Sequence, residues 1–165
     1  MNYKIREILK SDYLEVAVLY KKLKIYWREY MFDFYANYRK GAEMKSDSDV
    51  ALNVIKKKHL EKNSKFLVLE VDNKVVWFIY GTLFRHEDWV YKINDLILWE
   101  LKHIFIDEIY RWKWFSIILR DSLFEWFIQN NVKVVEIWVN PDNPVFKIYK
   151  KWGFNSKYCF VSKEL

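Results

Sequence analysis

The stretch HIFIDEIYRWKWFS, residues 103–116, joins an apolar strand-like run to an apolar helix-like run through a turn that contains two tryptophans. Turns of this kind are usually built from glycine and short polar residues, because these tolerate the backbone angles that the turn requires. The presence of two of the largest side chains in this turn therefore needs an explanation. The residues allow three explanations: a stacking platform for nucleic acid, a membrane wedge, or a loop whose glycines have been lost.

The hydrophobic pattern on either side of the turn predicts a mixed sheet with helices on its faces. After the turn, Phe115, Leu119, Leu123 and Phe127 recur at four-residue steps, which is typical of a helix that faces a core. We predict strands over residues 2–8, 65–71, 75–84, 97–107, 133–140 and 158–165, and helices over residues 12–23, 48–60, 115–130 and 143–152, with helical character in residues 25–45. Ser11 or Asp12 is the expected cap of the first helix.

The predicted fold class is α/β, a mixed α+β sheet of six to seven strands in a single domain over residues 1–165. A chain of 165 residues is long enough to bury a core without disulfides or metals. Its only cysteine is Cys159, and its three histidines are scattered singly, so we expect no disulfide and no metal site.

Composition also bears on location and partners. The longest unbroken apolar run, Val75–Tyr80, is far short of the ~20 residues of a membrane span. The charged N-terminal segment lacks the apolar core of a signal peptide, so we expect a cytoplasmic protein without a membrane partner. The net charge of +6 favours anionic partners in general, but the lysines are spread along the chain. We read Lys56–Lys58 as a solvated helix face and expect no nucleic-acid partner.

Three segments, in this order, resemble the GCN5-related N-acetyltransferase superfamily. They are the hairpin VLEVDNKVVWFIYGTL (68–83), the strand–loop–helix segment HIFIDEIYRWKWFS (103–116), and VNPDNPVFKIYKKWGF (139–154), which has an Asn-containing turn and a helix that ends in Tyr-x-x-x-Gly-Phe. The opening and closing segments are similar as well, so the resemblance covers nearly the whole chain. It implies the acyl-CoA N-acyltransferase fold, acetyl-CoA as cosubstrate, and transfer of an acetyl group to a primary amine of a small molecule or a protein.

The resemblance also implies a binding site for the cosubstrate. In this superfamily a glycine-rich loop at a helix N-terminus holds the CoA pyrophosphate, because bare backbone amides and the helix dipole favour an anion. The matching residues here are Arg111, Trp112, Lys113, Trp114, Phe115 and Ser116. The backbone of Ile104, Phe105 and Ile106 would pair with the pantetheine amides. Asn143, or in its place Asn140, would contact the pantetheine arm.

For the acetyl transfer itself, the resemblance suggests Glu100 as the base that takes the amine proton and Tyr149 as the acid that protonates the departing thiolate. Glu100 could equally be an exposed strand residue, and Tyr149 a core aromatic. We expect His103 to be a satisfied or exposed strand residue. The aromatic stretch Tyr26–Tyr38 could line the acceptor pocket or form a packed helix pair. The sequence leaves the acceptor and a homodimer open.

The tryptophans of the loop allow two interpretations. In the first they are genuine, the loop cannot cradle a pyrophosphate, and the chain is a catalytically degenerate domain that acts as a binding or scaffold module. In the second they are glycine codons translated with the wrong table, because some bacteria read UGA as glycine and others read it as tryptophan. The chain has three glycines and nine tryptophans, which together make up about the share that glycine alone usually has. Trp77, Trp112 and Trp114 stand at family glycine positions, and Trp99 is a further candidate.

Overall fold

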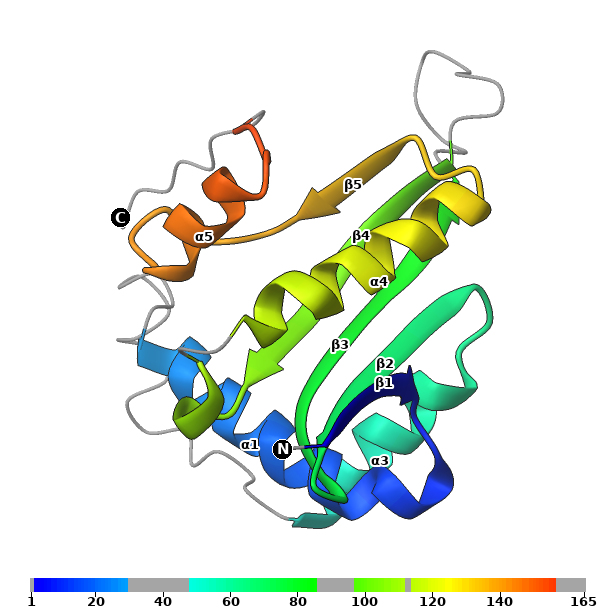
Figure 1. Ribbon diagram of the computed structural model, residues 1–165, viewed down its shortest axis with the longest axis vertical. Coiled ribbons are helices and arrows are strands. Elements are labelled where there is room, and N and C mark those ends of the chain that lie inside the picture. Colours follow the sequence, from blue (N-terminus) through cyan, green and yellow to red (C-terminus); the bar gives the residue numbers. More distant parts are fainter. Residues whose placement is uncertain (1, 30–47, 86–96, 112–113, 157–165) are drawn as a thin grey trace, which may run out of the picture.

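The computed structural model describes residues 2–29, 48–85, 97–111 and 114–156 (Figure 1). Its strands are β1 Tyr3–Glu7, β2 Ser64–Val71, β3 Lys74–Arg85, β4 Ile97–Ile106 and β5 Val134–Ile137. Its helices are α1 Tyr13–Glu29, α3 Ser48–Leu60, α4 Phe115–Gln129 and α5 Val145–Lys151, with short 3₁₀ turns at Lys10–Asp12 and Glu108–Tyr110. The predicted order of elements is confirmed over these residues. The strand predicted over 158–165 and the helical character expected in residues 30–45 lie outside the described residues.

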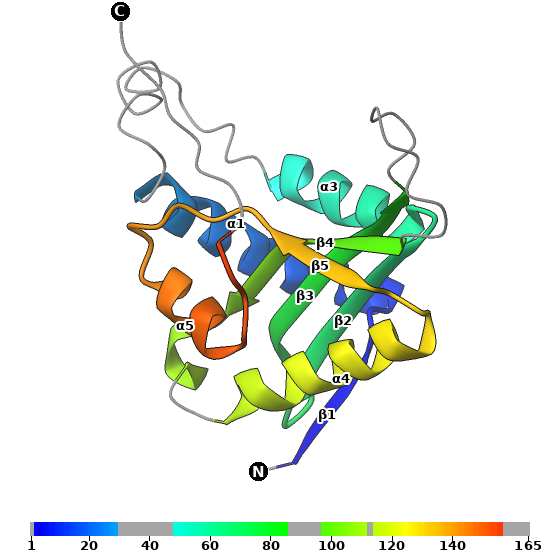
Figure 2. The same cartoon turned by 90° about the horizontal axis from the view of Figure 1, so that it is seen from above.

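The described strands form one sheet in the order β1-β2-β3-β4-β5. The pairs β1–β2, β2–β3 and β3–β4 are antiparallel, and β4 and β5 run parallel. Helices α1 and α3 cover one face of the sheet, and α4 covers the other face (Figure 2). The prediction of a mixed sheet with helices on both faces is therefore confirmed, with five strands among the described residues where six to seven were expected.

The β2–β3 hairpin turns on Asp72 and Asn73, which both have positive φ angles, of 47° and 66°. Two consecutive residues in this region are typical of a type I′ turn, whose twist matches that of the flanking strands. Lys74, which the sequence pattern placed in the turn, already belongs to β3. The turn therefore has two residues rather than three.

Each face of the sheet carries its own apolar core. The core under α1 and α3 contains Val16, Leu23, Ile55 and Phe78 among its fully or nearly fully buried side chains. The core under α4 contains the helix residues Phe115, Leu119, Leu123 and Phe127 together with strand residues that include Leu69, Trp77 and Trp99. All four helix residues are buried, which confirms the four-residue spacing as the buried face of α4.

The start of α1 differs from the prediction. The carboxylate of Asp12 accepts hydrogen bonds from the Leu9 amide at 2.7 Å and from the Arg6 guanidinium at 2.6 and 2.9 Å. Arg6 also binds Glu70 on β2 at 2.6 Å. Asp12 therefore faces back toward β1 and ties the helix start to the sheet edge, so the prediction that it caps the amides that follow it is wrong.

Candidate functional site

Strands β4 and β5 are paired over a short stretch and then separate. The parallel ladder runs from the pair Leu98–Val134 to the pair Leu101–Ile137, where β5 ends. The prediction of a strand up to residue 140 is wrong, because β5 leaves the sheet at this point. On the other side of β4, the register with β3 jumps at a bulge, since Tyr80 faces His103 and Gly81 faces Leu101. Figure 1 shows β5 running away from β4 toward α5.

This separation leaves an open strand edge. Beyond Leu101, no described strand pairs with β4 on the side that faces β5. An unpaired strand edge presents a row of backbone N–H and C=O groups that can pair with another extended chain. The three residues predicted to bind the pantetheine amides, Ile104, Phe105 and Ile106, lie in this open segment. The ladder geometry therefore leaves backbone groups available in the segment where the prediction needs them.

The open edge leads to the start of α4. Trp114 precedes the helix, and no side chain caps its first amides. The buried Phe115 anchors the first turn in the core, and Ser116 follows it within the same turn. An uncapped helix N-terminus offers backbone amides and a favourable dipole to an anion. Trp112 and Lys113, the centre of the predicted pyrophosphate loop, lie outside the described residues.

Arg111 lies at the junction between β4 and this loop. Its Nε donates a hydrogen bond to the carbonyl oxygen of Ile106 at 3.3 Å. The guanidinium carbon lies 5.3 Å from the ring centre of Tyr26 and 5.9 Å from that of Phe105. Arg111 is therefore folded over the end of β4 between two aromatic rings, and it also forms an ion pair of 3.6 Å with Glu108.

The structure places Trp114 against strand β1. Its ring centre is 5.2 Å from that of Tyr3, in an edge-on arrangement, and 5.4 Å from that of Phe115. The side chain remains 55% exposed. We expected the tryptophans of the loop to occupy the approach to α4, but for Trp114 the described contacts are with Tyr3 and Phe115.

Tyr149 lies on α5 and is almost fully buried. Its ring meets the rings of Trp152 at 5.7 Å and Phe154 at 5.9 Å. Burial, with a smaller contribution from the phenol of Tyr26, raises the pKa of Tyr149 well above its ordinary value. The hydroxyl therefore keeps its proton at neutral pH, which is the state that a general acid requires.

Tyr26 opens the aromatic stretch that the sequence left as an acceptor-pocket lining or a packed helix pair, and it was not predicted to lie beside Arg111 and Tyr149. It lies on α1 and is close to both Arg111 and Tyr149, so it connects the end of β4 to α5. The signal for it was weak: Tyr26 follows Leu19 and Leu23 at helical spacing, which places it on the buried side of α1. Its proximity to Tyr149 on α5 depends on tertiary structure, which that spacing does not contain.

Asn143 is buried and shapes the turn before α5. Its Oδ1 accepts a hydrogen bond from the Val145 amide at 3.0 Å, and its own amide donates to the carbonyl oxygen of Asn140 at 2.9 Å. Asn140 in turn accepts a bond from the Asp142 amide at 3.0 Å. Both asparagines therefore have structural roles in this turn, and a contact of Asn143 with pantetheine stays a prediction.

Glu100 lies on β4 just before the bulge. Its neighbours in the strand, Trp99 and Leu101, belong to the core under α4, so Glu100 points toward the face that carries α1. It is in register with Thr82 on β3 and with Glu136 on β5. Its carboxylate forms an ion pair with Lys102 and is only partly exposed. Glu100 is therefore not an ordinary exposed strand residue, although its role as a base stays a prediction.

His103 lies two residues past the bulge among aromatic rings. Its ring centre is 5.4 Å from that of Tyr20 and 6.0 Å from that of Trp27, and it stacks on Tyr80 at 6.1 Å. Burial, together with nearby lysine ammonium groups, lowers the pKa of His103 to about 3. The ring is therefore neutral at physiological pH. Its buried Nδ1 has no hydrogen-bond partner, so our expectation of a satisfied or exposed ring is wrong.

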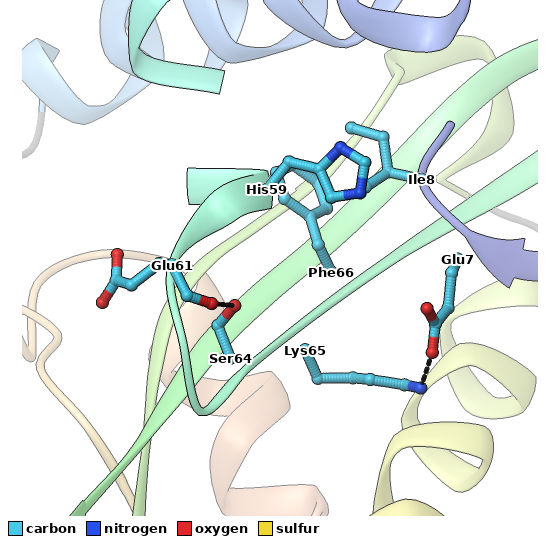
Figure 3. A pocket seen from close by; sticks show the side chains of 7 residues that line it. All are labelled: Glu7, Ile8, His59, Glu61, Ser64, Lys65 and Phe66. Carbon is cyan, nitrogen blue, oxygen red and sulfur yellow. Dashed lines mark hydrogen bonds and ion pairs between the residues drawn. The ribbon is translucent and has the colours of Figure 1, made fainter. Parts of the chain in front are cut away.

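A hollow lies away from this region, on the β1–β2 side of the sheet (Figure 3). It has a volume of about 160 Å³ and is lined by Glu7, Ile8, His59, Glu61, Ser64, Lys65 and Phe66. Its polar groups are largely engaged with one another or with neighbours. Lys65 pairs with Glu7, Ser64 donates to the Glu61 carbonyl at 2.7 Å, and His59 binds the Tyr13 hydroxyl at 2.7 Å. We assign no chemistry to it.

Comparison with known proteins gives one similar curated sequence and many similar structures. An uncharacterised N-acetyltransferase of Methanocaldococcus jannaschii is 27% identical over 164 residues, which cover 94% of this chain and 62% of the relative. The chain thus spans less than two thirds of that protein's length. No family model matches the chain.

The structural matches extend over nearly the whole chain. The tetramutant of the BH1408 protein of Bacillus halodurans superposes with a TM-score of 0.79 at 15% identity, covering 98% of this chain and 99% of that one. The aminoglycoside 6'-N-acetyltransferase AAC(6')-Ih of Acinetobacter baumannii gives 0.69 at 14% identity and covers 99% of both chains. AAC(6')-Iy, in complex with a bisubstrate analogue that contains CoA, gives 0.69 at 17% identity over the full length of both. These similarities show that the fold is that of acyl-CoA N-acyltransferases.

Two other kinds of feature, a membrane-spanning helix and a metal site, are not found among the described residues. None of the helices they form has the length and apolar character to cross a membrane. They also contain no group of three or more histidine, cysteine or carboxylate side chains arranged to hold a metal ion.

Proposed function

We propose that the chain is a GCN5-related N-acetyltransferase, which transfers an acetyl group from acetyl-CoA to a primary amine; its fold and its similarity to an N-acetyltransferase support this. The observation that carries the proposal is the open edge of β4 between the bulge at Leu101 and the uncapped start of α4. This segment supplies unpaired backbone amides and carbonyls along a line, followed by a site that favours an anion. Pantetheine has two amide groups, and the pyrophosphate is the anion that follows them.

The residues at the two ends of this line would hold the cosubstrate. The backbone of Ile104, Phe105 and Ile106 would bond the pantetheine amides, with Asn143 close to the arm. Arg111 and the first amides of α4, at Phe115 and Ser116, would hold the pyrophosphate together with residues 112–114. Arg111 would leave its present position over Phe105 and Tyr26 to do so.

The chemistry requires two proton transfers. The amine nitrogen attacks the thioester carbonyl carbon, so that the C–N bond forms and the C–S bond breaks. The amine loses a proton and the thiolate gains one. Tyr149 would supply a proton to the thiolate, since its buried phenol is protonated at neutral pH. Glu100 would take the amine proton on the α1 side of β4, after its ion pair with Lys102 opens.

We propose a small cationic molecule as the acceptor. The β4–β5 pair carries two carboxylates in register, Glu100 and Glu136, and an ammonium group could pair with them once Lys102 leaves Glu100. Aminoglycoside acetyltransferases are among the proteins of similar structure, which is consistent with a small amine. A protein amine would have to reach the same carboxylates.

The test is release of the CoA thiol from acetyl-CoA in the presence of a panel of amines: aminoglycosides, polyamines, amino acids and peptides with free N-termini. We expect turnover with at least one small cationic amine. The Glu100→Gln variant should lower turnover and flatten the acidic limb of its pH profile. Conversely, absence of thiol release with every amine, together with absence of acetyl-CoA binding, would establish the degenerate binding domain in place of the enzyme.

A further inference from the structure

Two tryptophans of the sheet are buried without a partner for their indole N–H. Trp77 on β3 and Trp99 on β4 are both 0% exposed, and neither Nε1 has a hydrogen-bond partner. Buried indole N–H groups usually find an acceptor, and buried polar groups are nearly always paired. Among the described side chains, the only other buried polar atom without a partner is Nδ1 of His103. The other described tryptophans all keep some exposure: Trp27, Trp114, Trp126, Trp138 and Trp152.

The ring of Trp99 also takes up the space of a neighbouring residue. A Cβ placed on Gly81, on the adjacent strand β3, would lie 1.9 to 2.4 Å from three carbons of this ring. Carbon atoms in ordinary contact are about 3.5–4.0 Å apart. The indole therefore lies directly on the Gly81 backbone, and it fits only because the sheet has no side chain there.

Both indoles point to the same side of the sheet. They fill the layer between the strands and α4, where Trp99 meets Phe127 at 4.5 Å between ring centres. Close backbone approaches between helix and sheet are fewer for α4 than for α1 and α3, and α4 lies on the face that carries both orphaned indoles.

The composition of the chain points to the same residue type. Three glycines are few for 165 residues and nine tryptophans are many, while the two counts together are ordinary for glycine alone. The orphaned N–H groups fall on Trp77 and Trp99, which the motif comparison had already matched to glycine positions or named as a candidate. They do not fall on Trp126 or Trp152. Two independent observations therefore select the same two positions.

We infer that residues 77 and 99 of the natural protein are glycines, encoded by UGA codons that were translated here as tryptophan. Trp112 and Trp114 belong to the same set, because their loop needs backbone approach to a phosphate. With glycine at 77 and 99 there is no indole N–H to bury. Helix α4 can then move onto the sheet with Phe115, Leu119 and Leu123 as its contact face.

The first test is the mass of the peptides that span residues 77 and 99, taken from the protein isolated from the cells that carry the gene. The expected result is glycine at both positions, with UGA in the gene at both codons. Tryptophan at either position in the native peptides, or UGG in the gene, overturns the inference. Trp126 serves as the internal comparison, because its peptide reports whether all or only some tryptophans are affected.

A second test needs no native source. Removal of a genuine core tryptophan leaves a large cavity and lowers stability severely. If positions 77 and 99 are natural glycines, the double variant Trp77→Gly/Trp99→Gly should melt at a temperature equal to or higher than that of the chain as written. Trp126→Gly, which removes an indole that is only partly buried, is the comparison. A double variant that does not fold, or that melts below this comparison variant, overturns the inference. Neither test measures acetyl transfer, so each can fail while the proposed function stands.

Discussion

The contact between Trp99 and Gly81 predicts that the smallest enlargement of Gly81 destabilises the chain as written. In Gly81→Ala, the added methyl would lie 1.9, 2.2 and 2.4 Å from three ring carbons of Trp99. Trp99 is fully buried and packs on Phe127, so the ring has no free space into which to move. Overpacking a core usually costs ~1–3 kcal/mol. Because three atoms overlap here, we expect a loss of ~3 kcal/mol in the free energy of unfolding.

The assay is urea unfolding followed by circular dichroism, with Gly153→Ala as the control. Gly153 has a φ of +90° and nothing within 4 Å of its virtual Cβ, so alanine there meets backbone strain without overlap. We expect the control to lose only ~1 kcal/mol. In a Trp99→Gly background the cost of Gly81→Ala should vanish, because the overlapping ring is gone. An alanine at 81 that costs less than the control, or costs the same in both backgrounds, would refute this reasoning.

Two further predictions concern the acid and the sheet edge. Tyr149→Phe should lower turnover by ~10²-fold or more, with little change in acetyl-CoA affinity. An unaltered rate constant would remove Tyr149 from the mechanism. Burial alone would raise the pKa of Asp12, but hydrogen bonds from Arg6 and the Leu9 amide lower it overall. The pair therefore stabilises the fold above the ordinary carboxyl pKa, and this stabilisation is lost as the pH falls through the lowered value. Accordingly, Asp12→Asn should cost ~2 kcal/mol in unfolding free energy at neutral pH, and the difference from the parent should shrink below about pH 4. A difference independent of pH would argue against the pair.

The regular elements could be predicted from the sequence because their signals are local. The four-residue spacing in α4 and the Asp72–Asn73 turn both follow from side-chain periodicity and backbone preference. Strand β5 was predicted too long, since its apolar pattern continues past Ile137 while its pairing with β4 stops there. Where a strand leaves a sheet depends on its neighbour, and periodicity along one segment does not show it.

The candidate site was predicted only where a motif carried it. The position of Arg111 at the end of β4 follows from the strand–loop–helix order, and the structure confirms that placement. The proximity of Tyr26 to Tyr149, and the aromatic surroundings of His103, arise from packing of α1 against distant segments. Asn143 shows a different difficulty: an asparagine suits both the turn before α5 and a contact with a ligand, and the sequence does not separate these two roles.

The central claim is that this chain binds acetyl-CoA through its strand edge and loop, and calorimetric titration of acetyl-CoA tests it most directly. The Trp112→Gly/Trp114→Gly variant should bind at micromolar levels, because its loop amides can approach the pyrophosphate. Two recovered charge-assisted bonds of ~1.5–3 kcal/mol each would make this at least roughly a hundredfold tighter than binding by the chain as written. If the glycine variant binds no acetyl-CoA, the site is not a CoA site. If the chain as written binds equally tightly, the loop tolerates tryptophan and the account of lost glycines in this loop is contradicted.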